Sequence, residues 1–350
     1  MVDYLVVGLG LAGTSFCETL RRNRKSFHVI TDRSQTSSRV AGGLLNPVIL
    51  KRFTLSWKAD EQLPLAIRFY EEIGEFLKVK ILEKRSVLRK FVSVEEQNLW
   101  FEATDKLALS PFLDSKLVPN TNDKVKASLG FGKVLETAVL DTQKLLQGYE
   151  KWLTSQNKLL LETFDYDAIQ FHSEFIDYKG FKAKHIVFAE GFGLAKNPFF
   201  NYLPMQGSKG EYLTIRVSDL NEEHILKSSV FLIPLGDDLY KAGATYSRGE
   251  KNNFPTATGK TELLDKLKKL LNGTFEIVDQ EAGVRPTVKD RRPLVGKHPK
   301  KDRVWLLNGF GSHGIMIGPW ASLALYHKIE HDLSILPEMD IARFEGVYPN

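Results

Sequence analysis

The sequence predicts an α/β fold in which a parallel sheet with flanking helices is interrupted by an inserted domain rich in antiparallel β-sheet (α+β). Three observations lead to this prediction. The chain opens with an apolar strand, a glycine-rich turn and a helix, and strand-rich segments interrupt the α/β pattern twice farther along. Its 350 residues, 43% hydrophobic and 26% charged, are enough for about two globular domains.

The first elements carry a nucleotide-binding pattern. Residues 4–7 are a continuous apolar run, typical of a parallel strand buried on both faces. The turn Gly-Leu-Gly-Leu-Ala-Gly at 8–13 follows at once, residues 14–22 are expected to form a helix, and residues 27–30 the next strand. Asp32 follows the third glycine by about 20 residues, the spacing of the acidic residue in dinucleotide-binding folds.

Each of these positions has a physical purpose. Gly8 permits a tight turn, Gly10 lets the backbone approach a pyrophosphate, and Gly13 lets the helix pack closely on the strand. The helix N-terminus offers free N–H groups and a partial positive charge to phosphates. Asp32 is expected to accept a hydrogen bond from a ribose hydroxyl. The pattern therefore predicts a Rossmann-like dinucleotide-binding domain.

The loop that follows favours FAD over a nicotinamide cofactor. Residues 33–58 are rich in Ser, Arg and Gly and do not continue a regular alternation of strands and helices. The next buried strand that ends in glycine comes only at 185–191. Nucleotide-binding folds with such long insertions are more common among flavoproteins than among nicotinamide dehydrogenases.

The middle of the chain divides into helical and strand-rich segments. Apolar residues recur at helical spacing in 64–77, 145–153 and 263–271. Short β-like runs dominate 79–91, 115–138, 205–217, 228–246 and 274–286. We therefore expect an FAD-binding domain made of 1–84, 140–204 and 287–350, and a substrate domain made of 85–139 and 205–286.

A second glycine-rich turn lies near the C-terminus. Residues 281–293 end a strand and turn, and residues 304–307 form a buried strand. The glycine-rich segment 308–319 then opens a mostly apolar helix that is expected to run to about Ile329. A helix N-terminus aimed at a flavin would stabilise the negative charge of the reduced ring.

With these motifs, the chain resembles the FAD-dependent amine oxidoreductases of the D-amino-acid oxidase and glycine oxidase family. The motifs occur in the family's order along nearly the whole chain, at 8–13, 32, 41–43, 189–191, 282–286 and 309–319. The resemblance implies a flavin domain with a β-sheet substrate domain. It also implies oxidation of the C–N bond of an amine or amino acid by hydride transfer to FAD.

The resemblance further implies which residues form the site. Arg285, in a Gly-x-Arg-Pro block, is expected to bind the substrate carboxylate through two parallel hydrogen bonds, or else to be an ion-pairing arginine in a turn. His313 is expected to bond the flavin or substrate, or to pack beside its turn for structural reasons. Tyr246 is expected to line the pocket or to belong to the core. The residues expected to contact FAD are Gly8, Leu9, Gly10, Leu11, Ala12, Gly13, Asp32, Arg33, Ala41, Gly42, Gly43, Leu44, Gly191, Gly311, Ser312, His313, Gly314, Ile315 and Met316.

Two positions on the substrate side depart from the family pattern. Ser312 and His313 stand in a turn where glycine oxidases typically carry an arginine or another polar group. Phe231 stands where they often carry a tyrosine, and it offers no hydroxyl group. The motifs on the flavin side are intact.

Charge and cysteine content give the expected environment. Lys and Arg number 48 against 43 Asp and Glu, an excess that does not by itself require a nucleic-acid partner. Cys17 is the single cysteine, so an internal disulfide is excluded. No basic segment precedes the N-terminal apolar run, and no apolar stretch reaches the roughly 20 residues that cross a bilayer. We expect a cytoplasmic protein without a membrane partner.

No metal site is expected. Residues 327–331 match a His-x-x-Glu-His zinc pattern, but that site needs a further ligand, and the segment closes the helix that the flavin interpretation requires.

Two alternatives to a small amine or amino acid substrate stay open, as does the oligomeric state. Basic clusters at 21–25 and 297–303 allow a tRNA-modifying oxidoreductase, because the family includes the oxidative half of the enzyme that matures methylaminomethyl-uridine in tRNA. Segments 43–47 and 52–53 resemble that enzyme too. This alternative predicts a basic surface leading to the flavin and tRNA binding that weakens steeply with salt. The second alternative is a flavin-binding protein without turnover.

Overall fold

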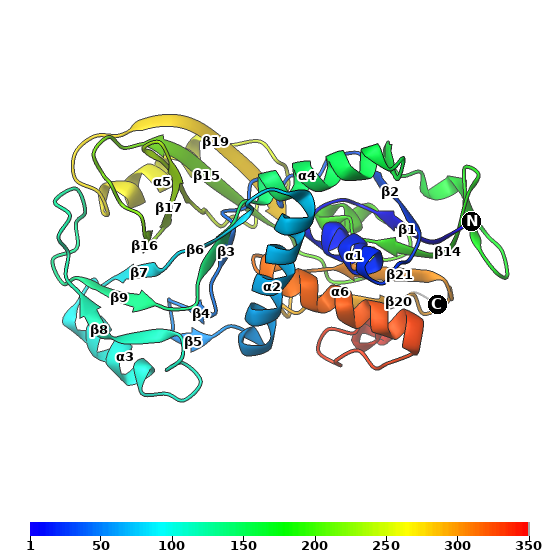
Figure 1. Ribbon diagram of the computed structural model, residues 1–350, viewed down its shortest axis with the longest axis horizontal. Helices are drawn as coiled ribbons and strands as arrows, with labels where there is room; N and C mark the ends of the chain where they lie inside the picture. Colours follow the sequence, from blue (N-terminus) through cyan, green and yellow to red (C-terminus); the bar gives the residue numbers. More distant parts are fainter. Residues whose placement is uncertain (349–350) are drawn as a thin grey trace.

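The computed structural model describes residues 1–348 and has two large sheets, one toward each end of an elongated molecule (Figure 1). One sheet is largely parallel and carries helices, and the other is largely antiparallel. The α/β class with a second, β-rich part, as expected from the sequence, is confirmed. The domain boundaries stay a prediction, because membership of a sheet does not by itself define a folding unit.

The first sheet has a parallel centre in the order β11-β2-β1-β14-β21, and the remaining strands pair antiparallel at its edges. Its strands are β1 (Val2–Val7), β2 (Phe27–Thr31), β11 (Leu159–Leu161), β12 (Ile169–Phe171), β13 (Ile176–Tyr178), β14 (Phe181–Phe188), β20 (Leu294–Lys297) and β21 (Val304–Asn308). Because β1, β2, β11, β14 and β21 run the same way, their carboxyl ends meet at one edge. That edge faces the second sheet (Figure 1).

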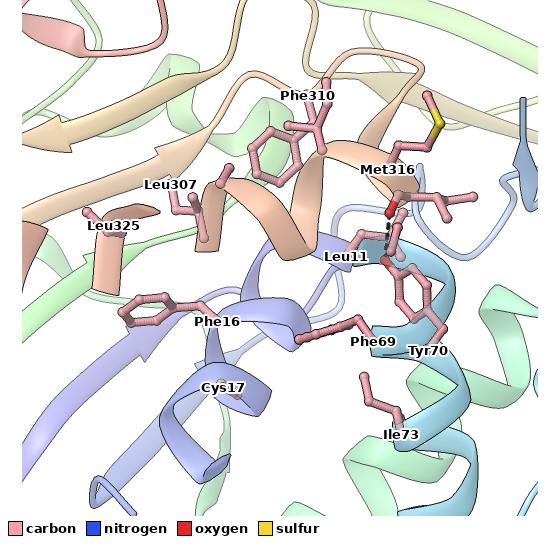
Figure 2. Packing of buried hydrophobic residues seen from close by; sticks show 14 of the residues in the cluster. Leu11, Phe16, Cys17, Phe69, Tyr70, Ile73, Leu307, Phe310, Met316 and Leu325 are labelled. Atoms are coloured by element: carbon pink, nitrogen blue, oxygen red, sulfur yellow. Dashed lines mark hydrogen bonds between the residues drawn. The ribbon is translucent and has the colours of Figure 1, made fainter. Parts of the chain in front are cut away.

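Helices cover one face of this sheet. They are α1 (Leu11–Arg22), α2 (Ala59–Leu77), α4 (Thr142–Ser155) and α6 (Gly314–His331). Figure 2 shows how Phe16 and Cys17 of α1, Tyr70 of α2 and Leu325 of α6 meet in one apolar core. A second apolar cluster fills the opposite face, beneath the short helical turns η1 (Tyr166–Ala168), η2 (Gly191–Lys196) and η3 (Ile341–Val347).

The second sheet has the order β19-β15-β18-β17-β16-β7-β9-β8 and is antiparallel except where β16 pairs with β7. Its strands are β7 (Val87–Lys90), β8 (Leu113–Val118), β9 (Phe131–Val134), β15 (Ser208–Arg216), β16 (Ile225–Lys227), β17 (Phe231–Gly236), β18 (Leu239–Gly243) and β19 (Glu276–Arg285). One face packs on α5 (Ala257–Lys268) through Leu213, Ala242 and Leu263. The other face carries Gly210, Tyr212 and Phe231, which line the cavity described below.

Two small sheets stand between the large ones. β3 (Leu44–Leu45), β10 (Ala138–Leu140) and β6 (Leu82–Lys84) form one, and β4 (Val48–Ile49) and β5 (Thr54–Leu55) form the other. β3 directly follows the 41–43 glycine segment. Gly43 has φ +75°, and a Cβ there would lie 2.0 Å from the carbonyl oxygen of Leu140. This close approach holds the glycine segment against β10 of the first small sheet.

One helix was missed by the sequence analysis. α3 (Val94–Thr104) lies where no helical stripe was recognised, because its apolar residues do not share one face. Val94 and Leu99 are exposed, while Trp100 and Ala103 are buried against β9 and its neighbours. The Ser-x-x-Glu pattern at 93–96, typical of a capping box, could have indicated the start of this helix. In the structure Ser93 Oγ accepts a hydrogen bond from the N–H of Glu96 at 3.3 Å. Among the described residues, no helix is long and apolar enough to cross a membrane.

Candidate functional site

A cavity of about 890 Å³ runs from the carboxyl edge of the parallel sheet to the open face of the second sheet. It brings together most of the residues expected from the sequence. Arg285 and Tyr246 line it on the side of the second sheet. The expected dinucleotide contacts that line it are Gly8, Leu9, Gly10, Leu11, Ala12, Asp32, Arg33, Ala41, Gly42, Gly43, Leu44, Gly191, Gly311, Ser312, His313, Gly314 and Ile315.

Gly13 and Met316 do not line the cavity. A Cβ at Gly13 would lie 2.0 Å from the carbonyl oxygen of Gly8, so this glycine lets α1 pack on the turn. Met316 was expected to contact the cofactor, but its side chain is buried in the core beneath α6 (Figure 2). Of α6, only Gly314 and Ile315 border the cavity, and the expected contact of Met316 with the cofactor stays a prediction.

The glycine turn after β1 is shaped by close backbone contacts. Gly8 has φ +100°, and a Cβ there would fall 2.5 Å from the carbonyl oxygen of Ala189 at the end of β14. Gly10 caps α1 without a side-chain hydrogen bond, and the N–H of Leu11 donates to Ser38 Oγ at 3.0 Å. The first turn of α1 carries no acidic residue. The helix N-terminus is therefore open to an anionic group.

Asp32 follows β2 at the same edge. Its carboxylate accepts hydrogen bonds from the Ser34 N–H at 2.9 Å and the Thr163 hydroxyl at 3.2 Å. Burial opposes ionisation, but these hydrogen bonds outweigh it and hold the pKa of Asp32 below its usual value. An ionised carboxylate here can accept further hydrogen bonds from hydroxyl groups. The neighbouring Arg33 also lines the cavity, but its guanidinium pairs with Glu150 of α4.

Glu190 is a cavity residue whose side chain the sequence analysis did not single out. Burial raises the pKa of this carboxyl to about 7, although hydrogen bonds from the Tyr166 hydroxyl and from Asn197 Nδ2, the latter at 2.7 Å, favour its ionised form. Its place in the sequence, after a buried strand and directly before Gly191, could have identified Glu190 as a site residue. A carboxyl group at the carboxyl edge of a parallel sheet lies where nucleotides bind.

The second glycine turn places the N-terminus of α6 at the cavity. Gly311 has φ +56°, and its N–H donates to the carbonyl oxygen of Pro286 at 3.1 Å, which ties the turn to the end of β19. His313 is the N-cap residue of α6, and its Nδ1 lies 3.1 Å from Ser312 Oγ. The residue is exposed and borders the cavity, and desolvation by the surrounding protein atoms lowers the pKa of its ring. At neutral pH the imidazole is therefore uncharged.

Arg285 ends β19, with its guanidinium over Gly210 of the neighbouring strand. Within the described residues the guanidinium donates only two hydrogen bonds, both long at 3.4 Å, to the carbonyl oxygen of Thr245. Within residues 1–348 it forms no ion pair, so the interpretation as an ion-pairing arginine is not supported. The guanidinium is available to an anion in the cavity.

Tyr246 lies in the loop after β18 and is 54% exposed, so its interpretation as a core residue is wrong. Desolvation would raise the pKa of its phenol, but the Ser208 hydroxyl and the charges of Arg248 and Arg291 lower it. Tyr246 borders the same end of the cavity as Arg285.

The two basic clusters do not lead to the cavity. Residues 21–25 span the end of α1 and the turn before β2, and residues 297–303 span the end of β20 and the turn before β21, so both clusters lie near the amino ends of parallel strands. The cavity is at the carboxyl ends. Several of these cations are also paired, as Arg22 is with Glu18 and Glu72. The basic surface that a tRNA substrate would require is not formed by these clusters.

Comparison with known proteins extends these observations. The sequence model of the family described as FAD dependent oxidoreductase matches residues 3–326. The glycine oxidase of Bacillus licheniformis is 32% identical over 114 residues, and that of Bacillus subtilis (strain 168) is 28% identical over 144 residues. These alignments cover 32% and 39% of this chain. They span 31% and 38% of the relatives, roughly a third of the length of the curated proteins they match.

Structural similarity covers much more of the chain. The crystal structure of glycine oxidase from Geobacillus kaustophilus superimposes with a TM-score of 0.78 at 20% identity, over 98% of this chain and 97% of that one. At this identity the comparison shows a shared fold. The family match, by contrast, extends over almost the entire sequence. This chain therefore belongs to the D-amino-acid oxidase family of FAD-dependent oxidoreductases, as its sequence motifs predicted, and FAD is its cofactor.

Proposed function

We propose that this protein oxidises the C–N bond of an amine that carries a carboxylate, with FAD as the electron acceptor. The observation that carries the proposal is the position of Arg285. Its guanidinium has no acidic partner within residues 1–348 and lies in the same cavity as the dinucleotide-binding turn and Asp32. A planar guanidinium binds a carboxylate through two parallel hydrogen bonds, which fixes the ligand's orientation as well as its position.

The residues of the cavity fit FAD. The turn at 8–13 offers its backbone and the open N-terminus of α1 to a pyrophosphate, and the ionised Asp32 is an acceptor for ribose hydroxyl groups. A Cβ at Gly42 would lie 2.9 Å from Ile233 Cδ1, so the 41–43 segment stands against the second sheet, where a ring system has to fit. When bound, FAD supplies a two-electron acceptor for a hydride from the substrate carbon.

The chain's own residues would bind and orient the substrate. Arg285 holds the carboxylate, which places the adjacent carbon and amine in the cavity between the second sheet and the turn at 309–313. The N-terminus of α6 directs its free N–H groups and partial positive charge at this region and stabilises negative charge that develops there. The uncharged His313 can donate or accept one hydrogen bond at the same place. An amine that arrives neutral needs no protein base, because its nitrogen lone pair forms the C=N bond as the hydride leaves.

The test is an anaerobic titration of the FAD-loaded protein with glycine, sarcosine, proline and D-amino acids, followed through the flavin absorbance. We expect at least one of them to bleach the flavin band of the wild type. In Arg285→Met the dissociation constant for that substrate should rise by about 10- to 150-fold, the effect of losing a charge-assisted hydrogen-bonded contact, with FAD still bound.

The matched control is Arg292→Met. Arg292 is near Arg285 in sequence but lies outside the cavity, where it pairs with Glu338. Its dissociation constant should equal that of the wild type. An unchanged constant in Arg285→Met would contradict the assignment, and a flavin band that none of these compounds bleaches would favour a protein without turnover on amino acids.

A further inference from the structure

A second cation lines the substrate side of the cavity. Across the open face of the second sheet, paired positions connect Arg285 to Lys227. The guanidinium of Arg285 lies over Gly210 of β15, and Tyr212 of the same strand pairs with Gly243 of β18. Gly243 pairs with Phe231 of β17, which pairs with Lys227 at the end of β16. Directly paired residues in antiparallel strands point to the same face, so this row forms the floor of the cavity.

Lys227 is in an unusual environment for a lysine. Its ammonium group lies 4.3 Å from the centre of the Phe231 ring, and both residues line the cavity. The nearest charged groups are those of Arg89 and Lys266, which are both cationic. Burial, and then these two charges, lower the pKa of Lys227 to about 8, so it is still mostly protonated at neutral pH. Within residues 1–348 no carboxylate pairs with it.

The acidic residues of the cavity wall lie elsewhere. They are Asp32, Glu162 and Glu190, and all three follow carboxyl ends of strands in the parallel sheet. On the same face of the second sheet Glu281 pairs with Lys241 at 2.9 Å, and neither of them lines the cavity, so among the described residues no acid of this sheet compensates Arg285 and Lys227. Two strand spacings of about 4.8 Å separate β15 from β17, and Gly210 lies two residues of about 3.4 Å each along β15 from the row that contains Phe231, so the guanidinium and the ammonium are about 12 Å apart. A small molecule with an acidic group at each end can span that distance.

We propose that Lys227 is a second anion-binding residue of the substrate site, and that the substrate is an amine with two carboxylates, one held by Arg285 and the other by Lys227. This inference rests on the proposed function, because it takes Arg285 as the first carboxylate site. A half-buried ammonium beside an aromatic ring loses hydration that only a ligand can replace. A second carboxylate would compensate the ammonium group for its lost hydration. Dicarboxylates are therefore favoured over the simple amino acids that Arg285 alone can hold.

Binding of carboxylates that cannot be oxidised tests this inference without turnover. The FAD-loaded protein is titrated with malonate, succinate and glutarate, and with the monocarboxylates acetate, propionate and butyrate, by following the perturbation of the flavin spectrum. In the wild type we expect one of the dicarboxylates to bind about tenfold or more tightly than the monocarboxylates. In Lys227→Met this preference should disappear while monocarboxylate binding is unchanged, and Lys227→Arg should retain it.

The control variant is Lys266→Met. It removes a positive charge that acts on Lys227 but belongs to α5, outside the cavity, where Lys266 pairs with Glu262. The dicarboxylate preference should survive in this variant, because a direct contact, and not the general field, creates it.

The other outcomes separate this inference from the proposed function. If Arg285→Met weakens all carboxylates while Lys227→Met leaves the dicarboxylate preference intact, the second site is wrong and the first stands. If Arg285→Met weakens none of them, the proposed function fails as well. If Lys227→Met loses FAD, Lys227 serves the cofactor, and the inference is overturned.

Discussion

Arg285 lies so close over Gly210 that the two residues exclude any side chain at position 210. A Cβ built on Gly210 would fall 1.9 Å from Nη2 and 2.2 Å from Cζ of the guanidinium. The strand next to β19 thus carries a glycine at the point where the arginine must lie flat against the sheet. The position of the Arg285 guanidinium therefore depends on the absence of a side chain at Gly210 in the neighbouring strand.

Replacing Gly210 with alanine should displace Arg285 without removing it. We expect Gly210→Ala to raise the dissociation constant for acetate by about tenfold or more, because the guanidinium can no longer present two parallel hydrogen bonds. FAD should stay bound, since Gly210 is on the substrate side. The measurement is the flavin-perturbation titration. Gly249→Ala is the control, because a Cβ there would meet only Ser247 Oγ at 3.6 Å. Equal constants for the two variants would contradict the expected displacement.

Tyr70 supplies a hydrogen bond that the backbone of α6 cannot make. Pro319 lies inside α6 and has no N–H to donate to the carbonyl oxygen of Ile315, four residues earlier. The buried Tyr70 hydroxyl donates to that oxygen at 3.0 Å (Figure 2). Tyr70→Phe should therefore reduce the free energy of unfolding by about 1–3 kcal/mol, the cost of a buried polar group without a partner.

A double-mutant cycle in urea checks this explanation. In Pro319→Ala the backbone N–H at position 319 can reach the same carbonyl oxygen, so adding Tyr70→Phe should cost much less in that background. The same cost in both backgrounds would show that the hydroxyl does not replace the missing backbone donor.

Glu190 should make stability fall as the pH rises toward neutrality. Burial raises the pKa of its carboxyl to about 7 in the folded protein, from an ordinary value of 4.5. Between these values the unfolded chain releases the proton and the folded protein keeps it, so unfolding becomes easier. The loss is up to about 3 kcal/mol and is complete above pH 7.

Urea unfolding at pH 5, 6, 7 and 8, with FAD in the same excess, measures this slope. Glu190→Gln should flatten it. Glu162→Gln is the matched control, because hydrogen bonds from Tyr178 and Lys179 lower the pKa of Glu162, so its contribution changes only in the acid range. A slope that survives in Glu190→Gln would assign the pH dependence to other groups.

The nucleotide-binding end of the site could be predicted because its residues are close together in sequence. The strand, turn, helix and acid all fall within residues 4–32, so their spacing in the sequence records the local geometry, although β1 also pairs with β14 and α1 also packs on α6. Gly13 shows this well, since its Cβ would clash with a carbonyl group only five residues earlier. The family match and the cofactor were predicted for the same reason.

The substrate end could not be predicted in the same way. Lys227 stands in a short strand, and nothing in its sequence neighbourhood marks it as a cavity residue. The burial of Met316 depends on how α6 packs with its neighbours, and its expected contact with FAD stays a prediction. Helix α3 was missed because its apolar residues do not share one face. Val94 and Leu99 are exposed, whereas Trp100 and Ala103 are buried.

The sequence by itself determined the α/β class and identified the glycine turn at 8–13, Asp32 and the arginine of the Gly-x-Arg-Pro block, all of which border the cavity. Only the tertiary structure decided that Gly210 leaves room for Arg285, that Tyr70 completes α6, and that Lys227 lies across the same sheet from Arg285. Local motifs depend on backbone geometry over a few residues, which the sequence records directly. The floor of the cavity depends on strand pairing between distant segments, because register decides which side chains share a face.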